Sequence, residues 1–330
     1  MKKGIAKFNA RGGRAPIGGV FPDGKIGGTG TGMKRKYNAE LLLITAPALF
    51  KILLFSFVPL IWLVISFQFY IPSGGILGSE WVGWDNFRYL VTSNTFFSMV
   101  RNAIVMNLLD ISVGTVVGVL LGLLMFEITV KIQVKVLQTI FFFPYFITWA
   151  IAGALMDAFI GDAGYITVLI KSITGKEIDF YARPDLWWGI LCFMGVWKGA
   201  GVSGVVNYAV LLGADREMYE AADLDGATRW QKMIYLSLPY MKNMLVVNVI
   251  MSCSNILRYD FSKVYFCTGN YSTLYDTTEV IETYMYRALR TSGLYEPSTA
   301  AGLLQSCVGL VLCAVANFIT RKISPESSLF

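Results

Sequence analysis

Apolar residues dominate six stretches of the chain, and each stretch is long enough to cross a lipid bilayer. A helix needs about 20 predominantly apolar residues to span some 30 Å of hydrocarbon. The fifth stretch is short and polar, but without it the charged segments on either side would lie on the same side of the membrane. The pattern predicts spans near Leu41–Phe67, Ala103–Met125, Leu137–Phe159, Leu186–Leu211, Met241–Leu257 and Ala300–Ile319.

The composition of the chain supports a membrane location. Hydrophobic residues make up 55% of the 330 residues and charged residues only 15%, with a mean hydropathy of +0.55. A soluble domain usually carries about a quarter charged residues, so this chain has too little polar surface to cover itself in water. Lipid around the helices removes that problem. We therefore expect an all-α integral membrane protein with six transmembrane helices.

Lysine and arginine are unevenly distributed between the connections. Most of the 28 lie in the N-terminal tail, the second and fourth connections and the C-terminus, which share one side if the spans alternate. Because positive charge is retained in the cytoplasm, we predict that both termini are cytoplasmic. The chain then divides into a flexible basic tail (1–36), a membrane domain (37–323) with a cytoplasmic loop (212–240), and a short C-terminal tail (324–330).

Several kinds of chemistry are excluded by what the sequence lacks. It has no histidine, which removes histidine bases, Ser-His-Asp triads and histidine-ligated metals. Its five cysteines form no CxxC pair and read as small buried side chains. No Walker A sequence occurs, since the near match at Ser172–Glu177 has Ile170 where the first glycine is required. We expect a non-catalytic chain that does not itself bind ATP.

A charged loop, Glu217–Lys242, interrupts the apolar pattern. Glu217, Glu220 and Asp223 recur every three residues, so on a helix they share one face. Burying one such carboxylate at mid-bilayer costs roughly 2.5–3.5 kcal/mol. This acidic face must therefore meet water or a basic partner.

The same loop carries a second, apolar face and clear helix boundaries. Ala221 and Ala222 favour a helix and have little bulk, which allows another surface to approach closely. Gly226 breaks the helix, because glycine accepts positive φ at little cost. A helical pattern resumes over Thr228–Leu238, and Pro239 marks its end. The loop is predicted to be a short docking helix, a turn, and a second helix that leads back into the membrane.

The spacing within this loop resembles the EAA loop of permease subunits in binding-protein-dependent bacterial ABC importers. The family pattern is EAA, three residues, glycine, nine residues and I-x-L-P, and this sequence differs only by a leucine for the isoleucine. The matching residues are Glu220, Ala221, Ala222, Gly226, Leu236, Leu238 and Pro239. Three further segments, Glu80–Leu90, Gly195–Gly201 and Val280–Ser306, are similar to the carbohydrate branch, particularly its oligosaccharide and polysaccharide members. The resemblance covers roughly residues 37–323.

This resemblance implies an ABC importer type I permease fold with a cytoplasmic EAA coupling helix. Glu220, Ala221, Ala222 and Gly226 would dock on a cytoplasmic ATPase subunit. The implied partners are a second, homologous permease, two ATPase subunits, an extracytoplasmic solute-binding protein, a sugar and membrane lipid, but no nucleic acid. ATP and Mg would bind the ATPase, with no cofactor on this chain. The location would be the bacterial cytoplasmic (inner) membrane.

The identity of the sugar stays open at this point. The external loops carry nearly balanced charge, which does not distinguish acidic polysaccharides, such as alginate or pectin fragments, from neutral oligosaccharides. A different class of function is also possible: a secondary transporter or channel that works without a partner ATPase. Removal of the ATPase would abolish uptake only if the importer hypothesis is correct.

Polar residues in the fifth span are candidates for a solute path. Asn248, Ser252, Asn255 and Tyr259 lie at offsets that share one helical face. Lipid would penalise such a face, so it lines either a water-filled path or a helix interface. We favour the path, because the resembling permeases carry solute between the fourth to sixth spans of two subunits.

Other candidate path residues flank that face. Trp197 and Tyr259 are possible platforms for a sugar ring, and Lys198 lies beside Trp197. Arg258 either attracts an anionic sugar or extends its charge to the membrane surface.

Asp110 is an ionisable residue within the second span, where such residues usually have a partner or a function. We hypothesise that it forms an ion pair with Lys51 or Lys198. Three small residues follow it at intervals of four and let another helix approach closely. They are Gly114, Gly118 and Gly122.

Overall fold

The computed structural model describes residues 39–323, and it separates into two units, Met1–Leu54 and Phe55–Phe330. In the first unit, helix α1 (Ala39–Ile52) contains Pro47 and is followed by the π-helical turn η1 (Leu53–Phe57). Leu43, Ile44 and Phe50 on α1 are exposed, as expected of a helix that faces lipid.

The second unit is almost entirely helical in its described part. Its one sheet there is a two-residue antiparallel ladder that pairs Gln68 with Trp81 and Phe69 with Glu80. The elements in chain order are η2 (Val58–Phe67), β1 (Gln68–Phe69), β2 (Glu80–Trp81), α2 (Asp85–Thr92), α3 (Asn94–Glu127), α4 (Lys131–Phe142), η3 (Phe143–Phe146), α5 (Trp149–Ile160), α6 (Tyr165–Thr174), η4 (Phe180–Ala182), η5 (Pro184–Leu186), α7 (Trp187–Leu211), α8 (Arg216–Leu224), α9 (Arg229–Lys232), η6 (Met233–Ser237), α10 (Leu238–Cys253), α11 (Phe261–Cys267), η7 (Ser272–Leu274), α12 (Tyr275–Thr278), α13 (Ile281–Arg290) and α14 (Tyr295–Ile323).

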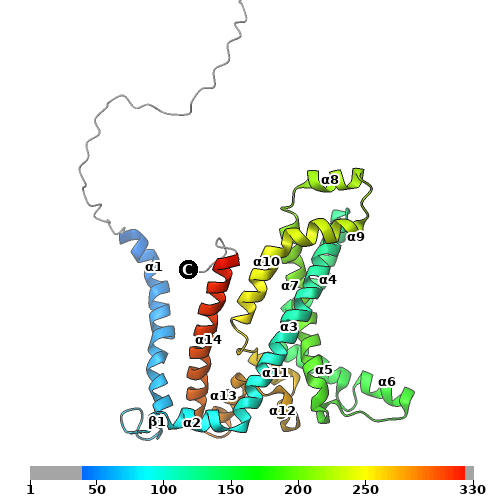
Figure 1. Cartoon of the computed structure of the whole chain (residues 1–330). Helices are drawn as coiled ribbons and strands as arrows, with labels where there is room; N and C mark the ends of the chain where they lie inside the picture. The colour runs from blue at the N-terminus through cyan, green and yellow to red at the C-terminus, as the bar shows by residue number, and fades with distance from the viewer. Residues whose placement is uncertain (1–38, 324–330) are drawn as a thin grey trace, which may run out of the picture. The chain divides into compact units, whose positions relative to one another are not determined.

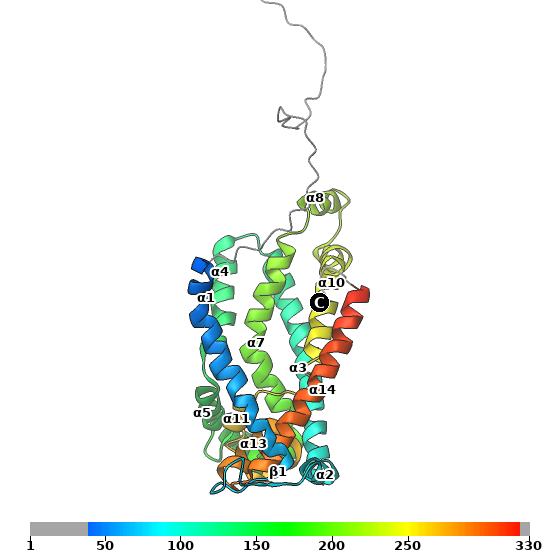
Figure 2. The same cartoon turned by 90° about the vertical axis from the view of Figure 1, so that its left-hand side faces the viewer.

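Helices α3 and α7 form the most extensive packing within this unit (Figure 1). Glycines make their close approach possible: a Cβ added at Gly122 would lie 2.6 Å from Asn207 Cβ, and one at Gly118 would collide with Ser203. Within the unit, α8 lies at one end and α2 and α13 lie at the other (Figures 1 and 2).

Six helical segments among the described residues are long and apolar enough to cross a membrane, which confirms the predicted number. They cover Leu43–Phe67, Asn94–Glu127, Trp149–Thr174, Pro184–Leu211, Arg229–Cys253 and Tyr295–Lys322. The all-helical fold class is likewise confirmed, apart from the short ladder.

The third predicted span is wrong in detail. Leu137–Phe159 is not one helix, because the turn η3 at Pro144 separates α4 from α5. Proline has no N–H for the helical ladder and clashes with the preceding turn. Thr148 then starts α5 by accepting a hydrogen bond from Ile151 N, and the apolar segment continues through α6.

The fifth predicted span ends too late. The apolar helical segment begins at Arg229, within the predicted loop, and α10 ends at Cys253 instead of Leu257. Residues 254–260 are not helical, and Asp260 caps the next helix, α11, by accepting from Ser262 N and Lys263 N. Serine and asparagine here favour local hydrogen bonds over a continued helix.

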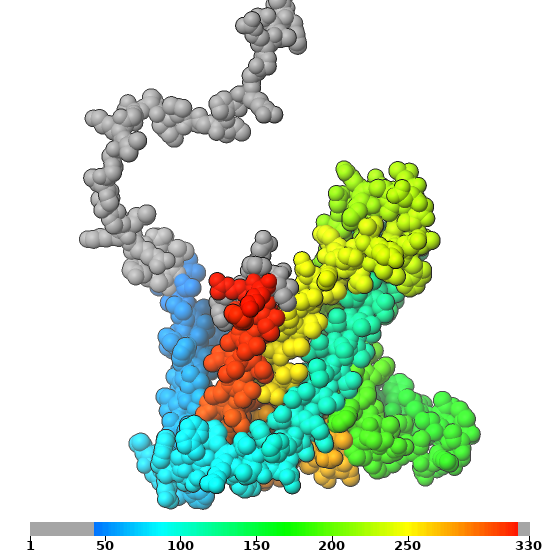
Figure 3. Space-filling model, in the orientation of Figure 1, coloured from blue at the N-terminus to red at the C-terminus, as the bar shows by residue number. Residues whose placement is uncertain are grey.

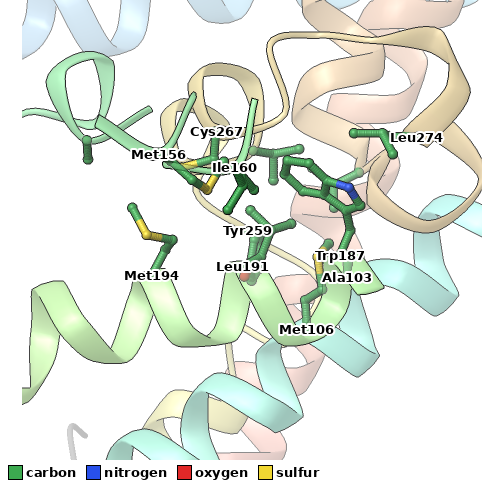
Figure 4. Packing of buried hydrophobic residues seen from close by; sticks show 13 residues of the cluster. Ala103, Met106, Met156, Ile160, Trp187, Leu191, Met194, Tyr259, Cys267 and Leu274 are labelled. Carbon is green, nitrogen blue, oxygen red and sulfur yellow. The ribbon is translucent and has the colours of Figure 1, made fainter. Parts of the chain in front are cut away.

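The largest cluster of buried side chains among the described residues draws on α3, α5, α7 and α11 (Figure 4). Trp187 in this cluster is fully buried, and its Nε1 donates to Phe180 O at 2.8 Å. Leu191, Met106 and Met156 join the same cluster from α7, α3 and α5. This cluster fixes α11 against α5 and α7, and so sets where the chain returns after α10.

Candidate functional site

A polar cavity of about 630 Å³ opens between α3, α7 and α10. Its walls alternate amides and hydroxyls with small residues that keep the space open. The lining residues are Asn107, Asp110, Ile111, Gly114, Thr115, Gly195, Val196, Gly199, Ala200, Ser203, Asn207, Leu245, Asn248, Met251, Ser252 and Asn255. Such a lining offers hydrogen-bond donors and acceptors to a polar solute, and it would be costly to expose to lipid.

Three of the candidate path residues lie together on this cavity. Asn248 and Ser252 project from α10, and Asn255 follows just after the helix ends. All three are exposed in this chain. The helical offsets identified Asn248 and Ser252 as one face, while Asn255 reaches the same cavity from the non-helical bend. Their role in transport stays a prediction.

Tyr259 is placed differently from its prediction. Its side chain is only 7% exposed, which leaves no open ring face for a sugar. Its hydroxyl donates to Asp110 Oδ2 at 3.0 Å. Burial, and then the charge of Asp110, raises the pKa of Tyr259, so the hydroxyl keeps its proton. Tyr259 is therefore a buried partner of Asp110 and not a sugar platform.

The predicted partner of Asp110 is also wrong. Lys263, on α11, donates from Nζ to Asp110 Oδ2 at 2.6 Å and to the Tyr259 hydroxyl at 2.6 Å. Lys198 instead donates to Tyr145 O at 2.7 Å, so neither it nor Lys51 is the partner. The sequence placed Lys263 in an external loop, because the return of α11 into the protein is not visible in a hydropathy pattern.

Trp197 and Arg258 lie outside the polar cavity. Trp197 borders a separate, apolar pocket of about 680 Å³ together with Phe159 and Phe193. Arg258 is exposed, and its backbone carbonyl accepts a hydrogen bond from Asn107 Nδ2 at 2.9 Å. Among the described residues, Asn107, Thr115, Ser203 and Asn207 are cavity residues that the sequence did not single out. The sequence feature that could have identified them is the recurrence of polar residues within the otherwise apolar helices α3 and α7.

The loop that carries the EAA pattern projects from one end of the second unit (Figure 3). Asp215 caps α8 by accepting from Glu217 N at 3.0 Å. Glu220 and Ala221 are exposed and Ala222 is half-buried, so the motif is available at the surface. Gly226 has a φ of +75°, which confirms that this position favours glycine.

The second half of the loop is tied back to the first. Thr228 and Gln231 form a reciprocal capping box at the start of α9. Lys232 Nζ donates to Asp223 Oδ1 at 2.6 Å across the turn. A hollow of about 320 Å³ between the two halves is lined by residues that include Ala222, Gly226 and Tyr235. These contacts hold α8 as a preformed projection.

Residues 114–327 match the family described as binding-protein-dependent transport system inner membrane component. The chain belongs to this family. This permease is thus a non-catalytic, multi-pass inner-membrane subunit of an ABC importer. The alternative of a secondary transporter or channel is set aside.

Individual relatives place the permease among carbohydrate permeases. It is 34% identical to the polygalacturonan/rhamnogalacturonan transport system permease protein YteP of Bacillus subtilis, over 89% of this chain and 90% of YteP. It is 32% identical to Protein LplB of the same organism, over 88% of this chain and 91% of LplB.

A solved structure shares the fold. The permease matches a chain of a bacterial ABC transporter involved in the import of the acidic polysaccharide alginate, with a TM-score of 0.77 and 28% sequence identity. The match covers 87% of this chain and 96% of that chain. A second structure of the alginate transporter, in complex with an alginate pentasaccharide-bound periplasmic protein, matches with the same TM-score and identity.

Proposed function

We propose that this permease imports an acidic oligo- or polysaccharide of the uronic acid class, with pectin fragments as the best candidates. The observation that carries this proposal is the polar cavity between α3, α7 and α10. Its amides and hydroxyls match the hydroxyl groups of a sugar chain, which exchanges hydrogen bonds with water for hydrogen bonds with the wall.

The charge of the cavity is suited to an acidic sugar. Asp110 is the one acidic residue among those that line it, and Lys263 compensates its charge at 2.6 Å. An unpaired carboxylate about 4 Å from a uronate would oppose it by about 1–4 kcal/mol at the dielectric of water or of a protein surface. The ion pair removes most of this repulsion, while Asn207 and Asn255 supply amide donors for carboxylate oxygens.

The relatives support the same class of substrate. YteP is described as a polygalacturonan and rhamnogalacturonan permease, and the matched structures belong to an importer of alginate. Galacturonan and alginate are both chains of uronic acids. We favour galacturonans because the identity to YteP, at 34%, is higher than the 28% to the alginate transporter chain.

The complete importer, in this proposal, contains this permease, a second and different permease, two ATPase subunits and a solute-binding protein. Both termini and α8 face the cytoplasm. Glu220, Ala221, Ala222 and Gly226 dock on an ATPase, which binds ATP and Mg. Closure of the two ATPases is transmitted through α8 and opens the cavity alternately to the two sides of the membrane. The exposed motif at the end of the second unit supports this arrangement.

The test is the ATPase activity of the reconstituted complex with its binding protein. A galacturonate oligosaccharide is compared with an alginate oligosaccharide and a neutral arabinose oligosaccharide. We expect stimulation that is strongest for galacturonate and weakest for the neutral sugar. Equal or greater stimulation by the neutral sugar would contradict the acidic assignment, and failure of every sugar to stimulate would contradict a carbohydrate importer.

A further inference from the structure

The non-helical bend after α10 raises a question of backbone hydrogen bonding. Residues 254–260 join α10 to α11, and within a membrane protein such backbone groups need partners inside the protein. The bend supplies some of its own, since Asn255 N donates to Ser252 O and Arg258 N donates to Asn255 O. The carbonyls of Ile256, Leu257 and Arg258 are bonded by side chains from other helices.

Asn107 on α3 bonds two of these carbonyls. Its Nδ2 lies 2.8 Å from Ile256 O and 2.9 Å from Arg258 O, and 3.0 Å from Ala103 O in its own helix. One amide group thus bridges α3 to both sides of Leu257. A leucine of similar size at position 107 would fill the space and leave these carbonyls unpaired.

Gln305 on α14 bonds the carbonyl between them. Its Nε2 lies 2.7 Å from Leu257 O and 2.8 Å from Glu282 Oε1 on α13. Glu282 Oε1 also accepts from Tyr259 N at 3.2 Å. Gln305 is only 6% exposed, so these bonds are shielded from competing water. Side chains from three helices therefore hold four consecutive residues of the bend.

The bend that they hold forms one end of the polar cavity. Asn107 both lines the cavity and bonds the bend, and Asn255 lines the cavity from the bend itself. The bend follows the end of α10 that lies away from α8 (Figure 1). A shift of the bend would move Asn255 relative to Asp110.

We propose that Asn107 and Gln305 are positioning residues for transport: they hold residues 254–260 so that Asn255 faces the path of the sugar. This inference deepens the proposed function and rests on it. The two amides do not contact the sugar through the atoms that bond the bend. They position the side chain of Asn255, which does contact the sugar. The group that Asn255 recognises is a hydroxyl or carboxylate of the sugar.

The experiment uses the whole complex in lipid nanodiscs, with the five native cysteines of this chain replaced and Asn255→Cys as a reporter. A charged methanethiosulfonate reagent is the probe. Asn107→Leu and Gln305→Met remove the amides at nearly constant volume. Ser112→Ala is the matched control, because the exposed Ser112 hydroxyl bonds carbonyls of its own helix, Leu108 O at 2.5 Å and Leu109 O at 3.3 Å.

The expected result is a changed reaction rate at position 255 in both amide variants, by about tenfold for loss of one buried hydrogen bond, and no change with Ser112→Ala. In the complex that retains Asn255, the same variants raise the KM for galacturonate oligosaccharide uptake, and Gln305→Met leaves the sugar-independent ATPase activity unchanged. An unchanged reaction rate in both amide variants, or an equal change in the control, would overturn the proposal. So would failure of both to assemble, because the residues would then be needed for folding.

The thiol reaction needs neither sugar nor ATP. If the wild-type complex shows no stimulation by galacturonate, the proposed function fails while the labelling still decides whether Asn107 and Gln305 position the bend.

Discussion

Lys263 Nζ lies 2.6 Å from Asp110 Oδ2, and 153 positions separate the two residues in the chain. The lysine side chain is 4% exposed and the aspartate side chain 27%. A Cβ added at Gly195 on α7 would collide with Lys263 Nζ. The ion pair therefore joins α3 to α11 across a glycine of α7, and its charges balance each other beside the cavity.

Neutralising one member of this pair should destabilise the permease. Asp110→Asn leaves a buried lysine without its counter-ion, which we expect to cost about 3–5 kcal/mol. Lys263→Met costs less, because the more exposed Asp110 can be hydrated through the cavity. The double variant should recover part of the loss. Thermal unfolding midpoints of the purified complex measure all three.

Lys198→Met is the matched control for that cycle. Lys198 bonds Tyr145 O and packs over the ring of Tyr145, so combining it with Asp110→Asn should not restore stability. Recovery with Lys198→Met, and none with Lys263→Met, would show that the pair is assigned to the wrong lysine.

Close packing between α3 and α7 makes a second prediction. A Cβ at Gly122 would approach Asn207 Cβ within 2.6 Å, whereas nothing lies within 4 Å of one at Gly114. Gly122→Ala should therefore destabilise the complex by about 1–3 kcal/mol through overpacking. Gly114 lies about two turns before Gly122 on the same helix, and Gly114→Ala should be neutral or slightly stabilising. Equal melting temperatures for both variants would contradict this account of the helix contact.

The membrane architecture was readable from the sequence because six apolar runs and their charged flanks follow directly from bilayer thickness. The interruptions were not. Pro144 indicates that the third span is interrupted, but whether a proline kinks a helix or ends it depends on the residues around it. The end of α10 at Cys253 depends on partners for the bend, such as Asn107 and Gln305, that are distant in sequence.

The candidate site was predictable to the extent that it follows local periodicity. Asn248 and Ser252 share a helical face and do line the cavity. Tyr259 was assigned to that face by extending a helix that ends before it, and the structure buries it beside Lys263 instead. Ion pairs between distant segments carry no local signal, which is why Lys51 and Lys198 were reasonable but wrong partners for Asp110.

The acidity of Glu282 gives a prediction about pH. Burial raises the pKa of this carboxyl above its ordinary value, against smaller opposing effects of its hydrogen bonds and of Arg258. The folded protein thus binds the proton more tightly than the unfolded chain. The stabilisation that protonation of Glu282 gives the folded protein grows as the pH falls through the raised pKa. It is complete below the ordinary pKa of about 4.3.

Glu282→Gln tests this linkage. Glutamine keeps an oxygen that accepts from Gln305 Nε2 and Tyr259 N, but it cannot titrate. Compared with the wild type, the variant should gain melting temperature at neutral pH, and the difference should shrink as the pH is lowered toward 5. A difference that grows on acidification would mean that the pKa of Glu282 is lowered and not raised.

The turn after α8 provides a further prediction. Gly226 has a φ of +75°, and a residue with a Cβ costs roughly 1–2 kcal/mol in this conformation. Gly226→Ala should therefore weaken docking of the ATPase and lower sugar-stimulated ATP hydrolysis. Gly226→Asn should retain more activity, because asparagine tolerates positive φ. As a control, Gly189→Ala adds a Cβ that meets nothing within 4 Å and should leave hydrolysis unchanged.

The most direct measurement of the central claim is uptake of a labelled galacturonate oligosaccharide into sealed vesicles that contain the complex, with the binding protein outside and ATP inside. We expect uptake that requires both ATP and the binding protein and that is lost with Glu220→Lys on α8, while Asp162→Lys, an exposed charge reversal away from α8, leaves it intact. Uptake that continues without the ATPase subunits, or that survives Glu220→Lys, would contradict it.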